Sequence, residues 1–278
     1  MSLNSVNFLG VPMVSTSIDE VLREIAKFVA SQAQKSPLVI FTPNPEFLVE
    51  ASRNDNFRNL LNKSDINLPD GIGLVWASRI LGKPIKERIS GADVVERLLK
   101  EGNESGRREV GSGKELTRKW TVGIAGARRG VQEEADDLIK RLQKKYPNIT
   151  FVNLDDTNFK SNLKDRILNV KNDSKFNVQD SRFNIIFACY GMEKQEKWIM
   201  ENKDKIKANV FMGIGGSLDF ITGFTKRAPL LIRKMGLEWL WRGLQRPKHF
   251  KRIWKAVFVF GWLVIKEKFV SARSLLAE

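Results

Sequence analysis

The sequence predicts an α/β protein with a Rossmann-like, mostly parallel sheet that has helices on both faces, followed by a helical C-terminal appendage. Three observations predict this fold. Short apolar runs typical of buried strands alternate with segments of helical periodicity along most of the 278 residues. Several of these runs end in turns rich in glycine, proline or acidic residues. The net positive charge rises and the strand-helix alternation ends near residue 226, which divides the chain into a core, 1–225, and an appendage, 226–278.

Positive charge is concentrated in the appendage. Of the net charge of +15, a share of +10 lies in residues 226–278, where 13 Lys or Arg stand against three acidic residues. Such a segment is typical of proteins that bind phosphate groups, in nucleic acid, in anionic lipid or in a phosphorylated substrate. The single cysteine, Cys189, stands in an apolar run and indicates a reducing compartment.

The first predicted strands lead to a polar turn. We expect a strand over Val6–Met13 and, after a helix, a buried strand over Leu38–Phe41 that ends in the proline-rich turn 42–46. Thr42 and Asn44 are therefore expected at the carboxyl edge of the sheet, where ligands bind in open α/β folds. They bind a ligand there or make local turn hydrogen bonds, and the sequence leaves both open.

A strand, a tight turn and a helix are predicted in the segment 65–93. The apolar run Ile66–Leu68 breaks at Pro69-Asp70-Gly71, and a helical pattern follows. The turn places the carboxylate of Asp70 at the same sheet edge, beside a helix N-terminus. Asp70 takes part in chemistry there, or it only caps the helix through Gly71.

The next helix follows the motif Ile89-Ser90-Gly91-Ala92-Asp93. Asp93 is expected in its first turn, where the helix dipole favours an anion. For Arg88, just before the motif, the sequence leaves two alternatives open. Its side chain binds a carboxylate or phosphate, or its charge is solvated. Residues 101–119 are rich in glycine and charge and are expected to form an exposed loop, as is the polar stretch 169–182.

Four further strands are expected, over Trp120–Ala125, Thr150–Leu154, Asn184–Tyr190 and Val210–Met212. The glycine turn after the first of them lacks the spacing of the dinucleotide fingerprint. The second ends in Asp155-Asp156, which we expect to be turn and helix-start residues. The last ends in a glycine turn that contains Gly213 and Gly216, two candidate substrate-binding residues.

No metal site and no cofactor are expected. The chain has no Asp-x-Asp motif, which metal-dependent glycosyltransferases normally carry, and one histidine and one cysteine cannot form a Cys/His cluster.

The appendage carries the pattern of a helix that lies in a membrane interface. Its apolar stripe consists of Phe250, Ile253, Trp254, Val257 and Phe258, with the neighbouring lysines and arginines mostly off it. An apolar run of ten residues, 256–265, is too short to span a bilayer. The alternative is an amphipathic helix packed on its own domain or on a second subunit.

Six motifs occur in the order seen in one family of bacterial glycosyltransferases. They are TPNPE at 42–46, LPDG at 68–71, ERISGAD at 87–93, a Gly-x-x-x-Gln-Glu turn at 191–196, GIGGSLDFITG at 213–223 and RAPLLIRKMGLEWLWRGLQRP at 227–247. Together they resemble the WecG/TagA/CpsF family over nearly the whole chain. The resemblance implies transfer of N-acetylmannosamine, or its uronic acid, from a UDP-sugar to N-acetylglucosamine on a polyprenyl diphosphate lipid. Such a reaction belongs to cell-surface polysaccharide or teichoic acid synthesis.

The resemblance also implies roles for individual residues. Asp70 matches the family's proposed catalytic base, and four residues match its pocket: Thr42, Asn44, Arg88 and Gln195. Arg242 and Arg252 match arginines of an appendage that covers the pocket and binds the membrane, and we count them as catalytic candidates because guanidinium suits a leaving diphosphate. Three positions depart from the family pattern: Glu193 replaces a proline, Arg246 an acidic residue and His249 an arginine.

These observations favour an inverting, metal-independent glycosyltransferase on the cytoplasmic face of the cell membrane. Its expected partners are a UDP-sugar, the lipid-linked acceptor and the anionic membrane surface, and a homo-oligomer remains open. Two alternatives come from other classes. A Rossmann-type oxidoreductase lacks its fingerprint here, and a basic nucleic-acid-binding protein lacks a recognisable binding motif.

Overall fold

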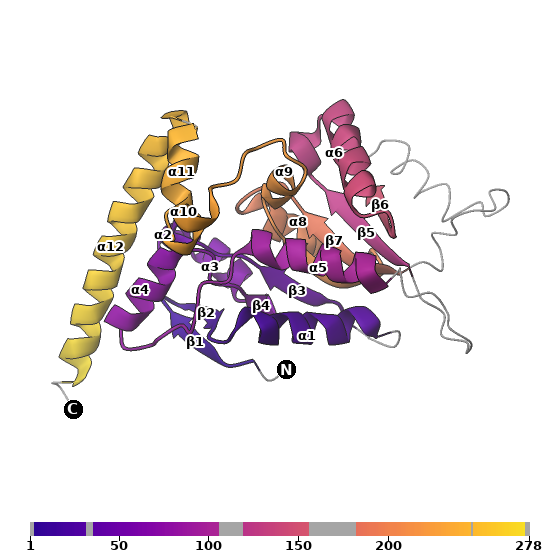
Figure 1. Cartoon of the computed structure of the whole chain (residues 1–278). Coiled ribbons are helices and arrows are strands. Elements are labelled where there is room, and N and C mark those ends of the chain that lie inside the picture. Colours follow the sequence, from indigo (N-terminus) through magenta and orange to yellow (C-terminus); the bar gives the residue numbers. More distant parts are fainter. Residues whose placement is uncertain (1–2, 32–35, 106–118, 156–181, 246, 276–278) are drawn as a thin grey trace, which may run out of the picture. The chain divides into compact units, whose positions relative to one another are not determined.

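The structure, a computed structural model, describes residues 3–31, 36–105, 119–155, 182–245 and 247–275 (Figure 1). Within these ranges, it leaves out the side chains of residues 129, 234, 242, 245, 247–253, 255 and 271–275. The chain forms two compact units. The first unit contains residues 1–21, 41–91 and 226–278, and the second contains 22–40 and 92–225. Whether 1–225 and 226–278 are separate domains stays a prediction.

A parallel sheet forms the centre of the second unit. Its strands are β3 (Leu38–Phe41), β5 (Trp120–Ala125), β6 (Ile149–Asn153), β7 (Phe183–Ala188) and β8 (Ala208–Gly213). They lie in the order β3-β8-β7-β5-β6, and all four pairings are parallel. A further short strand, β4 (Ile66–Asn67), belongs to the first unit. The Leu68 N–H next to it donates to the Phe41 carbonyl at 2.8 Å.

Both faces of the sheet are covered. Every residue of β3, β5 and β8 is buried, although successive residues of a strand point to opposite faces. The helices of this part are α1 (Ile18–Ala30), α5 (Gly91–Ser105), α6 (Gln132–Lys145), α8 (Lys194–Asn202) and α9 (Ser217–Ile221), with a 3₁₀ turn at Ala127–Gly130. Helix α6 packs on β6, and α8 packs on β7 and β8. The predicted fold class is confirmed.

The first unit combines a hairpin with helices. The hairpin is β1 (Ser5–Phe8) and β2 (Val11–Val14), and the helices are α2 (Pro45–Ala51), α3 (Asp55–Leu61), α4 (Ile72–Ile80), α10 (Leu230–Lys234), α11 (Glu238–Gln245) and α12 (Pro247–Leu275). Helix α12 packs on α2, α4 and α11. Phe260 and Val264 of α12 are buried, and the Phe260 ring lies 6.2 Å from the Phe8 ring.

Two predictions about local structure were wrong. The strand expected over Val6–Met13 is a hairpin, because Leu9 and Gly10 both have positive φ and reverse the chain between β1 and β2. The loop expected over 101–119 begins later, since α5 continues to Ser105. Gly102 permits this close packing, because a Cβ there would come within 2.5 Å of the Trp120 ring. The rest of that stretch, 106–118, and residues 169–181 lie outside the described residues.

Candidate active site

In the first unit, the turn that carries Asp70 is held by backbone hydrogen bonds. The Asp70 N–H donates to the Pro43 carbonyl at 2.9 Å, which ties together the turns that follow β3 and β4. Gly71 is the N-cap of α4 and has a φ of +142°, a conformation that favours glycine. The N-cap of α4 is a glycine and makes no side-chain capping hydrogen bond, and whether Asp70 also caps this helix stays open.

The Asp70 carboxylate contacts the start of α5. Its Oδ2 accepts a hydrogen bond from the Gly91 N–H at 3.2 Å. A Cβ at Gly91 would lie 2.9 Å from the Thr42 methyl group, so only glycine lets the backbone at residue 91 approach Thr42 this closely. The structure therefore brings the predicted residues Thr42 and Asp70 together around Gly91, with Asp70 half-buried and Thr42 buried.

Arg88 lies in the same unit and contacts the C-terminal segment. Its Nη1 is 3.4 Å from Oε2 of Glu238, the first residue of α11. The other oxygen of Glu238, Oε1, is 3.2 Å from Nε of Arg227. Glu238 was not among the predicted site residues, although the GLEW motif contains it.

Asn44 makes the local turn contacts that the sequence left open. Its side-chain oxygen accepts from the Glu46 N–H at 2.8 Å and from the Phe47 N–H at 3.3 Å, which caps α2. A direct role of Asn44 in ligand binding stays a prediction.

In the second unit, Gln195 is buried at the start of α8 and makes two internal hydrogen bonds. Its Oε1 accepts from the Gly215 N–H at 2.9 Å, and its Nε2 donates to Glu196 Oε1 at 2.7 Å. A Cβ at Gly213 would come within 2.9 Å of Gln195 Nε2, so Gly213 and Gln195 lie together. Gly216 is the N-cap of α9, and Asp93 lies in the first turn of α5 as expected.

Glu196 is a buried acid that the sequence analysis missed, although it forms part of the Gln-Glu motif. Burial raises its pKa from 4.5 to about 7, against the opposing effect of hydrogen bonds from Gln195 and from the backbone. The same carboxylate accepts from the Glu193 N–H at 2.6 Å and completes a capping box. Glu193 has a φ of +69°, which proline cannot adopt.

We expect Glu196→Gln to flatten the pH dependence of stability between about pH 4.5 and pH 7. In this range the folded protein holds more protons on Glu196 than the unfolded chain does. The free energy of unfolding of the wild type, relative to the variant, should therefore fall as the pH rises and level off above pH 7. Urea unfolding at a series of pH values measures this difference. Glu201→Gln, at an exposed position of the same helix, is the control, and parallel curves for wild type and Glu196→Gln would contradict the assignment.

Asp155 joins the ends of three strands in the second unit. Its carboxylate accepts from the Gly126 N–H and from the Tyr190 hydroxyl, the latter at 2.5 Å. Burial and Asp155 raise the pKa of Tyr190 above its usual value. The glycine turn after β5 is thus held by a carboxylate of the chain itself. Asp155 is the turn residue that the sequence predicted, and Asp156 lies outside the described residues.

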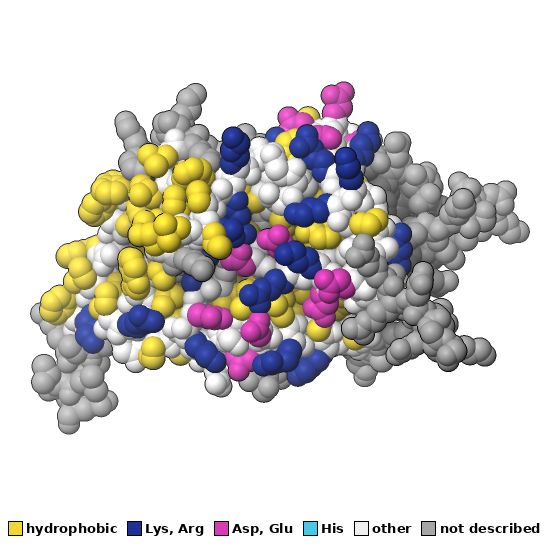
Figure 2. Space-filling model, viewed as in Figure 1, with side chains coloured by type: hydrophobic (Ala, Val, Ile, Leu, Met, Phe, Trp, Pro, Cys, Tyr) yellow, Lys and Arg dark blue, Asp and Glu magenta, His cyan; other side chains and the backbone are white. Residues whose placement is uncertain are grey.

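Exposed apolar side chains of the first unit gather over α4, α10, α11 and α12, where Figure 2 shows a broad hydrophobic surface. From the predicted stripe, Trp254, Val257 and Phe258 are exposed, and the side chains of Phe250 and Ile253 lie outside the description. Further exposed members are Trp76, Ile80, Leu230, Leu231, Met235, Leu244, Trp262, Ile265, Phe269 and Val270. Helix α12 therefore packs on its own unit through one side and leaves apolar residues exposed on another. Among the described residues, we find no helix with the length and hydropathy that a membrane crossing requires.

The side chains of Arg242 and Arg252 lie outside the description, so their predicted positions over a pocket remain predictions. Among the described residues, no group of three or more His, Cys, Asp or Glu side chains is placed to hold a metal ion.

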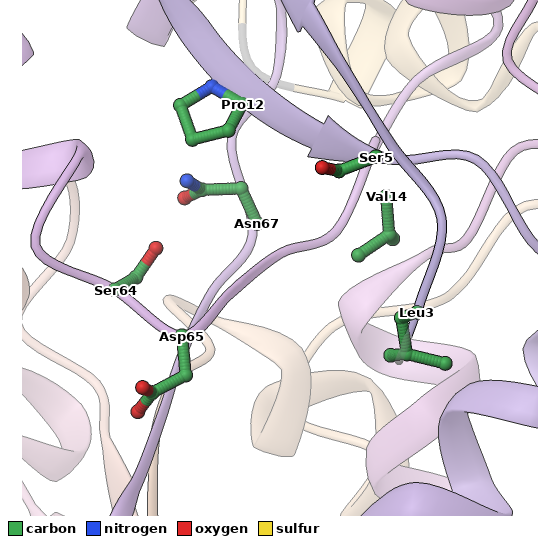
Figure 3. A pocket seen from close by; sticks show the side chains of 7 residues that line it. All are labelled: Leu3, Ser5, Pro12, Val14, Ser64, Asp65 and Asn67. Carbon is green, nitrogen blue, oxygen red and sulfur yellow. The ribbon is translucent and has the colours of Figure 1, made fainter. Parts of the chain in front are cut away.

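A cavity of about 200 Å³ lies in the first unit (Figure 3). It is lined by Leu3, Ser5, Pro12, Val14, Ser64, Asp65 and Asn67. The Asn67 side chain donates to the Leu61 carbonyl at 3.0 Å. None of the candidate catalytic or substrate-binding residues lines this cavity.

Comparison with known proteins finds a matching family model and several similar proteins. The model of the glycosyl transferase WecG/TagA/CpsF family matches residues 6–274. A protein of Staphylococcus aureus strain MW2, named N-acetylglucosaminyldiphosphoundecaprenol N-acetyl-beta-D-mannosaminyltransferase, is 31% identical over 263 residues, which cover 95% of this chain and 93% of the relative. Proteins of strains NCTC 8325 / PS 47 and COL have the same name, identity and coverage.

Proposed function

We propose substrates and a place of action for this chain, which belongs to the glycosyl transferase WecG/TagA/CpsF family. The chain is a glycosyltransferase, and the resemblance noted in its sequence motifs is confirmed. Its proposed reaction moves N-acetylmannosamine, or a related hexose or uronic acid, from a UDP-sugar to N-acetylglucosamine linked to a polyprenyl diphosphate. The names of the relatives support both the sugar and the acceptor. The product would serve the synthesis of a bacterial cell-surface polymer.

The observation that carries the proposal is the fixed carboxylate of Asp70. It lies at the carboxyl end of β4, half-buried, with one oxygen held by the Gly91 N–H. In the proposed step Asp70 takes the proton from the acceptor hydroxyl while that oxygen bonds to the anomeric carbon of the donor. The bond between the anomeric carbon and the diphosphate breaks, and UDP leaves with the electron pair. Attack from the face opposite the leaving group inverts the configuration.

The departing diphosphate gains charge and needs stabilisation by cations. Arg242 and Arg252 remain the proposed source, because guanidinium binds phosphate through two parallel hydrogen bonds. We propose that these arginines act in place of a metal ion, since the sequence has no Asp-x-Asp motif.

Transfer activity is therefore expected to survive an excess of EDTA. Arginine side chains are unaffected by a chelator, whereas a site that uses Mg²⁺ or Mn²⁺ loses its cation. Initial rates with and without EDTA, in enzyme already treated with chelator, measure the effect. Loss of activity that Mg²⁺ or Mn²⁺ restores would contradict the arginine-only account.

We propose that the enzyme works as a peripheral protein on the cytoplasmic face of the cell membrane. The exposed apolar residues on α12 and the charge of +10 in residues 226–278 support this place of action. Each Lys or Arg near an anionic bilayer contributes about 1 kcal/mol of attraction, and salt weakens it. A lipid-linked acceptor is reached at that surface, while the UDP-sugar arrives from solution.

A thermal shift experiment separates the proposed function from the two alternatives. We expect UDP to raise the melting temperature by about 5 °C at a concentration of 100 times its dissociation constant. NAD and a short oligonucleotide should have no comparable effect at matched ionic strength. Stabilisation by NAD alone would favour an oxidoreductase, and stabilisation by the oligonucleotide alone would favour a nucleic-acid-binding protein.

A further inference from the structure

Glu238 forms a buried ion cluster with two arginines in the first unit. Only 7% of the residue is exposed, and its two carboxylate oxygens contact different partners, Arg88 at 3.4 Å and Arg227 at 3.2 Å. The side chains of Arg88 and Arg227 are themselves mostly buried. Glu238 and Arg227 belong to the C-terminal segment, whereas Arg88 lies between α4 and α5. The cluster therefore links parts of the chain that lie far apart in sequence.

The position of Glu238 in the first turn of α11 has a simple partial explanation. A helix dipole favours an acidic residue there, but it does not require the side chain to be buried. A carboxylate that leaves water loses hydration, and only close cations with good geometry compensate for that loss. The dipole thus accounts for an acid at this position and not for its burial against Arg88.

Arg88 lies next to the backbone that fixes the candidate base. The Ile89 N–H donates to the Pro69 carbonyl at 3.1 Å, and the Gly91 N–H donates to Asp70. The backbone just before Asp70 and the Asp70 carboxylate are thereby tied to the residues just after Arg88. These hydrogen bonds fix the Arg88 backbone, and Glu238 contacts its guanidinium.

The C-terminal segment also touches the helix that follows Asp70. A Cβ at Gly236 would come within 2.5 Å of Cβ of Ile72, the first residue of α4. Gly236 has a φ of +74°, so glycine is favoured for both its conformation and its small size. The turn before Glu238 therefore packs against the start of α4, two residues after Asp70.

We propose that Glu238 is a positioning residue that orients the Arg88 guanidinium toward the diphosphate of a substrate. This inference rests on the proposed function. A guanidinium held in one orientation can bind a phosphate group through two parallel hydrogen bonds. Because Glu238 and Arg227 both belong to the C-terminal segment, the orientation of Arg88 depends on how that segment is seated. The diphosphate belongs to the UDP-sugar or to the lipid-linked acceptor.

The test is a double-mutant cycle in the full-length protein between Glu238→Gln and Arg88→Ala, read as kcat and as KM for each substrate. Glutamine keeps the shape of Glu238 and removes its charge. We expect Glu238→Gln to raise KM for one of the two substrates about tenfold, with a change in kcat of less than about threefold. The substrate whose KM rises identifies the diphosphate that Arg88 binds. In the Arg88→Ala background, Glu238→Gln should add no further loss, because its effect acts through Arg88.

Two further variants complete the test. Glu238→Asp retains the charge but shortens the side chain, so it should raise the same KM. This variant replaces Glu238→Gln in the cycle if Glu238→Gln does not fold. Glu267→Gln, which removes another acidic residue of the C-terminal segment, is the matched control and should leave both KM values unchanged. The inference would be overturned if the two substitutions lowered kcat independently, so that their effects multiplied, while the melting temperature fell and both KM values stayed unchanged. Glu238 would then be a purely structural residue. A wild-type protein that transfers sugar from no UDP-sugar would overturn the proposed function itself, and this inference with it.

Discussion

Asp70→Asn is expected to lower turnover by about 100-fold or more, as the loss of a general base does. Asparagine has nearly the same shape, and its side-chain oxygen can still accept from the Gly91 N–H that holds Asp70. The turn after β4 should therefore keep its structure while the side chain can no longer take a proton. Initial rates at saturating donor and acceptor, together with circular dichroism and the melting temperature, measure both parts of this prediction.

The control for this experiment is Asp204→Asn, which alters an exposed aspartate of the second unit. It should leave turnover within about twofold of the wild type, as expected for a surface substitution away from the site. A folded Asp70→Asn protein with near-normal turnover would remove Asp70 from the mechanism.

Truncation before Arg227 is expected to release the protein from anionic liposomes and to abolish transfer, even to a soluble acceptor analogue. The truncation removes the exposed apolar residues of α12 and all but one of the 13 cations of residues 226–278. It also removes Arg242 and Arg252, the proposed cations for the leaving diphosphate, and the Glu238 contact with Arg88. Liposome sedimentation and rates with the soluble analogue measure the two effects separately.

The truncation also uncovers part of the core, because Phe260 and Val264 pack into the first unit. A full-length variant, Trp254→Ser with Phe258→Ser, therefore accompanies it. Both residues are exposed, so this variant should stay folded, bind liposomes less tightly and keep its activity on the soluble analogue. A truncated protein that is folded and fully active on the analogue would make the appendage a simple anchor and would refute the roles given to Arg242 and Arg252.

Local pattern was sufficient to predict most of the sheet. The run at Trp120–Ala125 is apolar throughout because the strand is buried on both faces, and the structure places β5 over those residues. The hairpin at Leu9-Gly10 was missed because apolar residues continue on both sides of a two-residue turn. The end of α5 was misplaced because the packing of Gly102 against Trp120 overrides the low helix propensity of glycine.

The sequence predicted site residues that belong to motifs or follow strand ends, but it did not predict the contacts between them. Thr42 and Asp70 could be placed at one edge because both follow short buried strands. Gly91, which contacts Asp70, is 21 residues away in sequence, and Glu238, which contacts Arg88, is 150 residues away. Such contacts depend on tertiary packing. Glu196 was missed for a related reason, since its raised pKa comes from burial that a sequence motif does not reveal.

The most direct test of the account is a transfer assay read by mass. The purified protein is incubated with a set of UDP-sugars and with N-acetylglucosamine linked to a short-chain polyprenyl diphosphate, and the lipid product is analysed by mass spectrometry. The account predicts that the lipid gains the mass of one N-acetylmannosamine, or of a related hexose or uronic acid, and that UDP is released in equal amount. An acceptor of unchanged mass with every UDP-sugar, although the protein is folded and supplied with anionic lipid, would contradict it.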